Sequence, residues 1–537
     1  MRFYRRQAAG RSNGIPAHPG SGPGETSARR FPRARTTPSF AGTTALRGRR
    51  TGGIRSSMGY LLLLVVLAGC VAVGPDYVKP ELSLPENWHS PAAETLPQDP
   101  QVLARWWQAL EDPVLSDLMQ QAAADNLDVQ EALSRVREAR YQRRQSRAAL
   151  FPTLDASGAA QKSGRREDGG PDTETELYSA GFDAGWELDV FGGARRALEA
   201  ADADLTAGIE DYRDILVSLL AEVAVNYSDV RTTQARLTVT RRNLATLEET
   251  WQLLDALFQT GLGDELAVAQ ARYNLENARA RVPALKTGLE IALNRLAVLT
   301  GQAPGALHER LAEVRPIPSV DRRLAFGVPA DVLRQRPDIR RAERELAAQT
   351  ARIGEARADL YPRFSLSGSI GLEALSLGDL FSSGTRLWSL GPTVRWPVFD
   401  AGAIRGNIGV QTERRQQTLL RYEAAVLGAL EEVENSLTAL AREQEKMAFL
   451  EAAAEASRLA AGLAEEQYIA GLSDFNAVLD AQRSLLSFED QMTESRGAVF
   501  AELVRLYKAL GGGWQSFDPP ALAEHPEQME GIPHAQR

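Results

Sequence analysis

Side chains that could carry out chemistry are few in this 537-residue chain, and they are not grouped as a catalytic site requires. The histidines lie in tails or connecting segments, without the spacing of metal ligands and without an HExxH helix. No lysine follows a glycine, so the phosphate-binding GK motif of ATPases is missing. The sequence therefore predicts no catalytic residue, no metal site and no cofactor. The histidines are His18, His89, His308, His525 and His534.

The single cysteine, Cys70, ends the stretch "MGYLLLLVVLAGC". Its apolar run, Tyr60–Ala68, is shorter than the ~20 residues that a membrane-spanning helix needs. Arginines precede the run and small residues end it, as in a secretory signal. The ending Leu-Ala-Gly-Cys is typical of bacterial signals whose cysteine becomes the lipidated N-terminus; the alternative is a free thiol beside a buried apolar patch. We expect residues 58–69 to be a signal peptide and Cys70 to be lipidated.

Charge is unevenly distributed along the chain. Residues 1–57 contain twelve arginines and one acid, Glu25, a net charge of +11. The whole chain carries −9 and residues 58–69 carry none, which leaves −20 for the rest. The basic start lacks apolar periodicity and is expected to be a disordered extension, or an untranslated one if synthesis begins nearer Met58. The acidic body argues against nucleic acid as a partner.

The chain repeats itself at a distance of 210 residues. "LFQTGLGDELAVAQARYNL" from Leu257 and "QYIAGLSDFNAVLDAQRSL" from Gln467 share a Gly-Leu turn followed by an aspartate. The same shift lays "LDVQEALSRVREARYQRRQSRAALFP" over "PDIRRAERELAAQTARIGEARADLYP". Only around "VFGGARR" and "VFDAGAIR" does the offset slip by about two residues. We therefore expect two copies of one unit, residues 127–301 and 337–511.

Each unit begins with a helix and a hairpin. Leu127–Leu150 is rich in Ala, Arg and Glu without internal Gly or Pro, which favours a helix. The residues that follow alternate apolar with small or polar side chains, the period of a strand. We expect hairpins at about 151–192 and 362–400, with strands of ~10 residues, a length that crosses a membrane when tilted. A soluble hairpin on a helical bundle is the alternative.

A long helical hairpin follows. Ala194–Thr260 predicts a helix of 67 residues, about 100 Å at ~1.5 Å per residue, which exceeds the depth of a globular core. It should turn at Gly261, be capped again by Asp264, and return along Glu265–Thr300. The return helix and the helix expected at Ala330–Leu360, stacked end to end, would match the length of the long helix, and the three together would form a rod.

Four membrane strands cannot close into a barrel, and an open edge in lipid leaves backbone groups unpaired. The chains must therefore assemble, two for eight strands or three for twelve, and geometry alone does not choose between them. A tube of this length behind the strands indicates a conduit.

The chain resembles the TolC/OprM-like outer-membrane efflux factors, specifically the lipoproteins of RND-type tripartite efflux systems. The resemblance covers about 75–514 and rests on "GPDYVKP", "RWWQALEDPVLSDLMQQAAADNLDVQEALSRVREAR", "WELDVFGGARR", "PADVLRQRPDIRRAE", "ARADLYPRFSLSGSIG" and "YIAGLSDFNAVLDAQRSL". It implies an α+β membrane protein and a homotrimer, with long helical hairpins forming a periplasmic α-barrel and four strands per protomer in a 12-stranded outer-membrane β-barrel. It also implies a periplasmic membrane-fusion adaptor and an inner-membrane RND pump as partners. The remaining segments are then a lipidated N-terminal part (70–126), an equatorial linker (302–336) and a tail (512–537).

The resemblance also assigns roles to residues. The helical turns match the family's periplasmic tips, where adaptors are thought to dock, although each glycine can simply be a helix C-cap. Asp480 and Tyr468 match residues of the channel mouth and gate, while a second acidic position is Ala477 here. Trp186 and Trp396 suit a membrane-interface girdle, with ordinary packing as the alternative; Trp106 and Trp107 are expected in the core. The expected tip residues are Gly261, Leu262, Asp264, Gly471, Leu472 and Asp474.

The expected function is a passive exit channel for drugs or other small molecules across the outer membrane, anchored there by lipid and projecting into the periplasm. An exit duct of a type I protein secretion system would share the fold. A periplasmic coiled-coil adaptor lipoprotein would also carry a lipidated cysteine and long hairpins, but it would lack two barrel hairpins.

Overall fold

The computed structural model describes residues 72–81, 88–89, 103–165, 173–318, 330–382 and 384–518. Contacts divide the chain into residues 1–63 and 64–537, and all described residues belong to the second unit. The basic extension, the signal peptide, Cys70 and all but the first residues of the expected tail lie outside the described residues.

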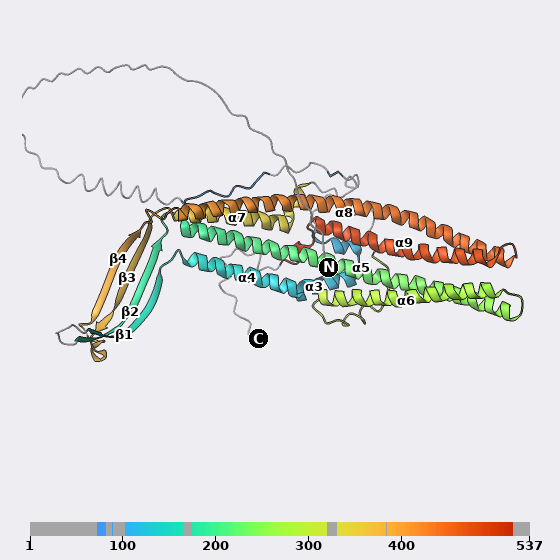
Figure 1. Cartoon of the computed structure of the whole chain (residues 1–537), viewed down its shortest axis with the longest axis horizontal. Helices are drawn as coiled ribbons and strands as arrows, with labels where there is room; N and C mark the ends of the chain where they lie inside the picture. The colour runs from blue at the N-terminus through green and yellow to red at the C-terminus, as the bar shows by residue number, and fades with distance from the viewer. Residues whose placement is uncertain are drawn as a thin grey trace, which may run out of the picture. The chain divides into compact units, whose positions relative to one another are not determined.

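The helices of the second unit repeat with an offset of 210 residues (Figure 1). The first and last residues of α4, α5 and α6 are each 210 positions before those of α7, α8 and α9. The slip of about two residues is confined to the loops that precede α5 and α8. The helices are α3 (Pro113–Asp125), α4 (Leu127–Ala148), α5 (Gly193–Gln259), α6 (Glu265–Leu299), α7 (Pro337–Ala358), α8 (Ala403–Ile469) and α9 (Phe475–Ala509), with short 3-10 helices η2 (Trp106–Leu110), η3 (Ala330–Gln335), η4 (Leu377–Asp379) and η5 (Trp514–Ser516).

The helix expected at Ala330–Leu360 is wrong at its start. The structure has the 3-10 helix η3 up to Gln335 and begins α7 at Pro337. Arg336 between them is extended (φ −62°, ψ 131°), as a residue before proline prefers. Proline then occupies the first helical position, where its missing N–H is not needed. The rest of α7 follows the prediction to within two residues.

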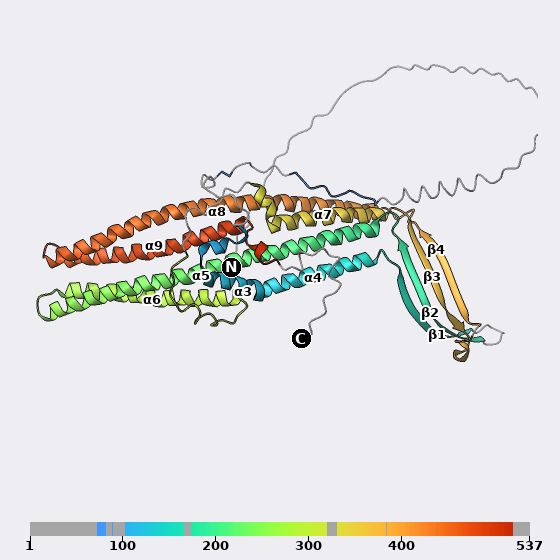
Figure 2. The same ribbon diagram turned by 180° about the vertical axis from the view of Figure 1, so that it is seen from behind.

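The long helices α5 and α8 are each 67 residues long, and the shorter helices pack along them. In Figures 1 and 2, α8, α7, α5 and α4 follow one another in that order across the first half of the unit, and α5–α6 and α8–α9 form the two hairpins of the other half. Contacts join α7 to both α5 and α8, and α4 to α5. None of the helices in the described part of the chain is apolar enough over a sufficient length to span a bilayer.

The strands form one antiparallel sheet in the order β1-β2-β3-β4, so the two hairpins join through β2 and β3. The strands β1 and β2 are longer than the expected ten residues, at 13 and 16. In this added length Lys162 pairs across the strands with Glu174 (2.9 Å) and Glu176 (3.3 Å). The strands are β1 (Thr153–Arg165), β2 (Thr173–Leu188), β3 (Arg363–Ala374) and β4 (Arg386–Arg395).

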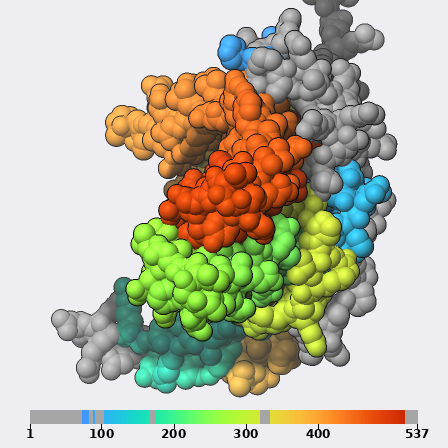
Figure 3. Space-filling model, turned by 90° about the vertical axis from the view of Figure 1, so that its right-hand side faces the viewer, coloured from blue at the N-terminus to red at the C-terminus, as the bar shows by residue number. Residues whose placement is uncertain are grey.

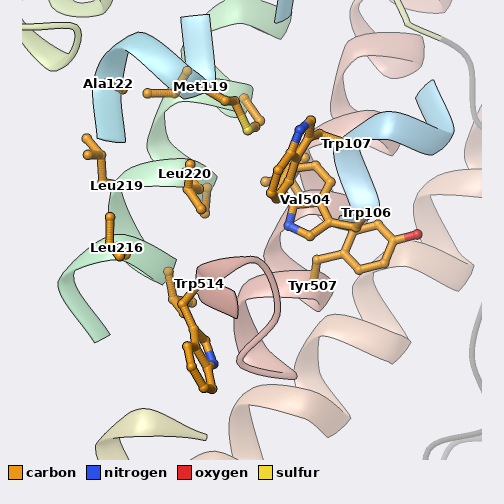
Figure 4. Packing of buried hydrophobic residues seen from close by; sticks show 14 of the residues in the cluster. Trp106, Trp107, Met119, Ala122, Leu216, Leu219, Leu220, Val504, Tyr507 and Trp514 are labelled. Carbon is orange, nitrogen blue, oxygen red and sulfur yellow. The ribbon is translucent and has the colours of Figure 1, made fainter. Parts of the chain in front are cut away.

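The main core lies midway along the helices and is built on aromatic rings (Figure 4). Trp106 stacks on Tyr507 with ring centroids 5.0 Å apart and meets Trp107 edge-on at 5.8 Å. Both tryptophans are 2% exposed, which confirms their expected place in the core. Here η2 and α3 pack against α5 and α9, so the segment before the first repeat ties the two repeats together.

The N-terminal segment is fixed to the start of α5 and to α7. The backbone N–H of Val73 donates to Phe191 O (3.0 Å), and Arg196 Nε donates to Val73 O (3.2 Å). A Cβ on Gly354 would lie 2.8 Å from Val73 O, so only glycine permits this approach. Lys79 then pairs with Glu343 at 2.7 Å.

We expect Gly354→Ala to loosen this segment, because its methyl group would collide with the backbone of Val73 and with Arg196. Such overpacking costs about 1–3 kcal/mol. The control is Gly208→Ala on α5, where nothing lies within 4 Å of the added Cβ and alanine favours the helix. Limited proteolysis before residue 81 should be faster in the first variant and unchanged in the second; equal rates would contradict the contact.

Candidate functional site

The two hairpin turns at the ends of α5 and α8 are nearly identical. Gly261 and Gly471 are left-handed, with φ of +75° and +70°. The next residue in each turn, Leu262 or Leu472, donates its N–H five residues back at 2.9 Å, which is a Schellman motif. Both leucine side chains are 80% exposed. The geometry needs the glycines and leaves one apolar side chain per turn in solvent.

An aspartate restarts the helix after each turn. Asp264 accepts a hydrogen bond from Leu266 N and Asp474 from Ala477 N, both at 3.2 Å. Both are N-caps, the role that the sequence predicted for Asp264. The capping holds the two turns in the same conformation.

The two hairpins pack against each other next to these turns, as the space-filling view of Figure 3 shows for α5–α6 (green) and α8–α9 (orange to red). Leu254 and Ala271 of the first hairpin contact Leu479 of the second. Arg483 donates to Tyr273 Oη and to Asn274 Oδ1, both at 3.1 Å. The turns are therefore held as one surface.

The two residues expected at a channel mouth have different surroundings. Tyr468 packs edge-on against Phe475 at 5.1 Å, within its own hairpin. Asp480 is 79% exposed, and its carboxylate lies 4.0 Å from Arg483. Ala477 stands one turn before Asp480 and supplies no second charge.

A buried carboxylate that the sequence analysis missed links three long helices. Glu489 on α9 is 2% exposed and bonds to Arg242 of α5 and to Arg458 of α8, the latter at 2.8 Å. It borders a groove of about 820 Å³ between these helices and residues 314–318. The repeat contained a signal for it: the counterparts of Glu489 and Arg458 are Arg279 and Glu248, which also pair, at 3.0 Å.

The pKa of Glu489 follows from these contacts. Burial by itself raises the pKa, but the hydrogen bonds from Arg458 and Arg242 outweigh it and hold the pKa below its ordinary 4.5. The pair therefore stabilises the fold above that pH, and the contribution is lost as the pH falls through the lowered pKa.

The sheet has two different faces. Because partners in every register pair share a face, even-numbered residues of all four strands lie together, and odd-numbered residues lie on the other side. The odd face is mainly Ser, Thr, Gly, Asp and Glu. The even face carries large apolar side chains that are exposed, namely Leu154, Phe182, Trp186, Ile370, Trp388, Leu390 and Val394.

The expected interface tryptophans stand where strands join helices. Trp186 Nε1 donates to Leu150 O (3.1 Å) and Trp396 Nε1 to Leu360 O (3.0 Å), the same bond in each repeat. Trp186 lies in β2, but Trp396 lies one residue beyond β4, because that strand ends at Arg395. Trp388, 76% exposed on the apolar face, was not singled out from the sequence.

We expect Glu489→Gln to lower the thermal stability of the helices at neutral pH, since two charge-assisted bonds are lost, a change of about 1–3 kcal/mol. The difference from the parent chain should shrink as the pH falls below 4.5 and through the lowered pKa of Glu489. Circular dichroism melts in detergent at several pH values measure both effects. Glu455→Gln, an exposed carboxylate on α8, is the control; a pH-independent difference would contradict the assignment.

Among the residues described, no group of three or more His, Cys, Asp or Glu side chains is placed to hold a metal ion.

A comparison with known protein families finds the same family in both repeats. The family model described as "Outer membrane efflux protein" matches residues 118–302 and 328–512.

Relatives and solved structures cover nearly the whole fold. Nodulation protein T of Rhizobium leguminosarum bv. trifolii is 34% identical over 78% of this chain and 90% of its own length. Toluene efflux pump outer membrane protein TtgF of Pseudomonas putida is 31% identical over 86% of this chain and 98% of its own. The outer-membrane channel OprN has a TM-score of 0.78 at 37% identity, covering 83% of this chain and all of that structure. The structure of CusC has a TM-score of 0.73 at 28% identity, covering 82% of this chain and all of that structure.

Proposed function

Because the chain belongs to the outer membrane efflux protein family, we propose that it is the outer-membrane channel of an efflux pump, through which small molecules leave the cell. The observation that carries this function is the sheet with one exposed apolar face and one polar face. An apolar band facing lipid and a polar face toward water is the pattern of strands that enclose an aqueous channel.

Assembly follows from the sheet. The outer edges of β1 and β4 have no partner within the four-strand sheet, and lipid cannot satisfy their backbone groups. Three copies would supply twelve strands, enough for an open interior, whereas eight would be filled by side chains. The homotrimer expected from the family fits this requirement. The 67-residue helices then project about 100 Å into the periplasm as a tunnel.

Lipidation of Cys70 is consistent with the position of the residues after it. Ala72 packs against Gly192, where β2 passes into α5. Trp186 and Trp396 lie at the same strand–helix boundary, which suits the membrane interface. We propose an acyl anchor and an aromatic girdle at one level.

The partners would meet the opposite end of the helices. The exposed leucines of the tip turns offer a periplasmic adaptor two equivalent contacts per chain, at Gly261, Leu262 and Asp264 and at Gly471, Leu472 and Asp474. The adaptor would connect the channel to an inner-membrane RND pump that supplies the energy. Asp480 and Tyr468 would lie near the mouth, where threefold symmetry would make Asp480 a ring of charge.

An exit duct for secreted proteins remains the second candidate, because the fold would serve both. The names of several relatives, which refer to efflux pumps for toluene, solvents and antibiotics, favour small molecules. Deleting the gene and measuring drug accumulation beside secreted protein separates the two functions. A periplasmic adaptor is disfavoured, because the structural relatives are channels.

We expect Gly471→Val and Leu472→Glu to increase drug accumulation in cells while oligomers persist. Valine at position 471, where φ is +70°, strains the turn by about 1–3 kcal/mol. Glutamate at position 472 replaces an apolar side chain that is 80% exposed with a charged one. Gly462→Val, on α8 with open space around it, is the control. Unchanged accumulation in both tip variants would argue against docking there.

We also expect a disulfide between copies in the variant Ser163→Cys/Ser389→Cys. Each β2 residue pairs with a β3 residue such that Ser179 faces Glu373. The repeat predicts an equivalent β4–β1 pair between copies. Adding 210 to Ser179 gives Ser389 of β4, and subtracting 210 from Glu373 gives Ser163 of β1 in the next copy. Facing residues on antiparallel strands are ~4.5–5.5 Å apart, within the range of a disulfide.

The readout is a covalent ladder of oligomers on non-reducing gels of outer membranes. Lys162→Cys/Ser389→Cys is the register control, because neighbouring residues on a strand point to opposite faces. The single variants control for the native Cys70. A ladder from the control and none from the test pair would overturn this register.

A further inference from the structure

The repeats are alike in sequence, but α5 and α8 are covered differently. On α5, Ala200, Glu210 and Val217 are buried, at 4%, 5% and 4% exposure. Their counterparts on α8, Val410, Leu420 and Leu427, are 48%, 53% and 67% exposed. The helix α5 packs against both α4 and α7, whereas of these two helices only α7 packs extensively against α8 in the described structure.

The helix that could fill this place is α4, the repeat counterpart of α7. In Figures 1 and 2, α4 and α8 are the outermost layers, with α5 and α7 between them. The outward face of α4 is unpartnered too: Glu138 and Tyr141 are exposed, whereas their counterparts Ala348 and Ala351 are 0% and 1% exposed. A copy of the chain set beside this one would place its α4 on α8, continuing the alternation.

Charges support this occupant. Asp211 on α5 lies between Arg341 of α7 (2.6 Å) and Arg135 of α4 (3.8 Å). A shift of 210 residues replaces Asp211 by Arg421, Arg135 by Glu345 and Arg341 by Glu131, so all three charges are reversed. Arg421 and Glu131 are exposed, and neither has an ion pair with any other residue that the structure describes.

The fold already contains one repeat contact with its sign reversed. Glu489 of α9 pairs with Arg458 of α8, and the counterparts Arg279 and Glu248 pair between α6 and α5. The two repeats thus keep the location of an ion pair while exchanging the charges. The charges around Arg421 are reversed in the same way. The difference is that Glu131 lies on α4, a helix that does not pack extensively against α8 within one chain.

We propose that Arg421 on α8 forms an ion pair with Glu131 on α4 of a second copy, the charge-reversed counterpart of Asp211–Arg341. The proposal rests on the assembly proposed above and names the helix face that builds it. Arg414, two turns from Arg421, occupies the position matching Asp204. Gln142, three turns from Glu131 and bonded to Glu138 (3.1 Å), occupies the position matching Arg352, so both faces continue with polar side chains.

The reversal also selects the correct helix for each site. Were α4 to take the place of α7 on α5, Glu131 would face Asp211, and like charges in contact are unfavourable. Were α7 to dock on α8 of a neighbour, Arg341 would face Arg421. Each short helix therefore fits one of the two long helices through this contact. The contact between copies is head-to-tail, as a ring requires.

The test is a charge-reversal cycle on the full-length protein in outer-membrane extracts. We expect Arg421→Glu and Glu131→Arg each to lower the temperature at which oligomers dissociate in detergent, and Glu131→Arg/Arg421→Glu to recover most of the loss. Arg421→Gln should have an intermediate effect. Arg442→Glu, an exposed α8 residue whose partner Glu445 is on the same helix, is the control.

The outcomes separate this pair from the assembly itself. Oligomers that withstand both single reversals, or a double variant no more stable than the single ones, would overturn the ion pair and leave the channel proposal standing. A parent chain that never forms oligomers would overturn the assembly. Helix content by circular dichroism, unchanged in every variant, excludes loss of the protomer fold as the cause.

Discussion

Backbone hydrogen bonding in lipid is the constraint on which this structure depends. The sheet presents a lipid-compatible face on its even-numbered residues, but the outer edges of β1 and β4 carry donors and acceptors that only another strand can satisfy. A soluble protein could cover such an edge with charge or a loop. In the assembly proposed above, copies of the chain complete the sheet, and the helices attached to its strands then lie side by side in the same order. The arrangement of the long helices is thus a consequence of closing the sheet.

The internal repeat lets one chain supply two kinds of contact with one design. The contact between α5 and α7 is made within the chain and can use small, buried residues such as Ala348 and Ala351. In the proposed assembly the equivalent contact of α8 is made with another copy, and its side chains are larger, both apolar, such as Leu420, and polar, such as Glu138 and Arg421. Interfaces that form after folding must remain soluble beforehand, which explains why the two repeats have the same helices but different surfaces.

Much of this architecture could be predicted from sequence because it depends on local signals. The 210-residue offset, the lengths of the long helices and the turns at Gly261 and Gly471 follow from periodicity and from glycine at helix ends. The errors arose where contacts overrode composition. The strands β1 and β2 run past the expected ten residues, where Lys162 pairs with Glu174, and Pro337 divides a segment that was expected to be one helix. Glu489 was missed although the repeat places an opposite pair at the same positions, because its arginines come from two other helices and their approach leaves no local signal.

The same distinction applies to the candidate sites. Each tip turn is specified by its own few residues, so its geometry can be read from sequence, but what docks on an exposed leucine is determined by a partner. Asp480 is the opposite case: the role proposed for its exposed carboxylate depends on a symmetry that brings three copies together. A single chain therefore contains the parts of the channel but not the channel. Its proposed function depends on surfaces that are incomplete in the protomer, and on the outward faces of α4 and α8 the two repeats differ in charge and burial.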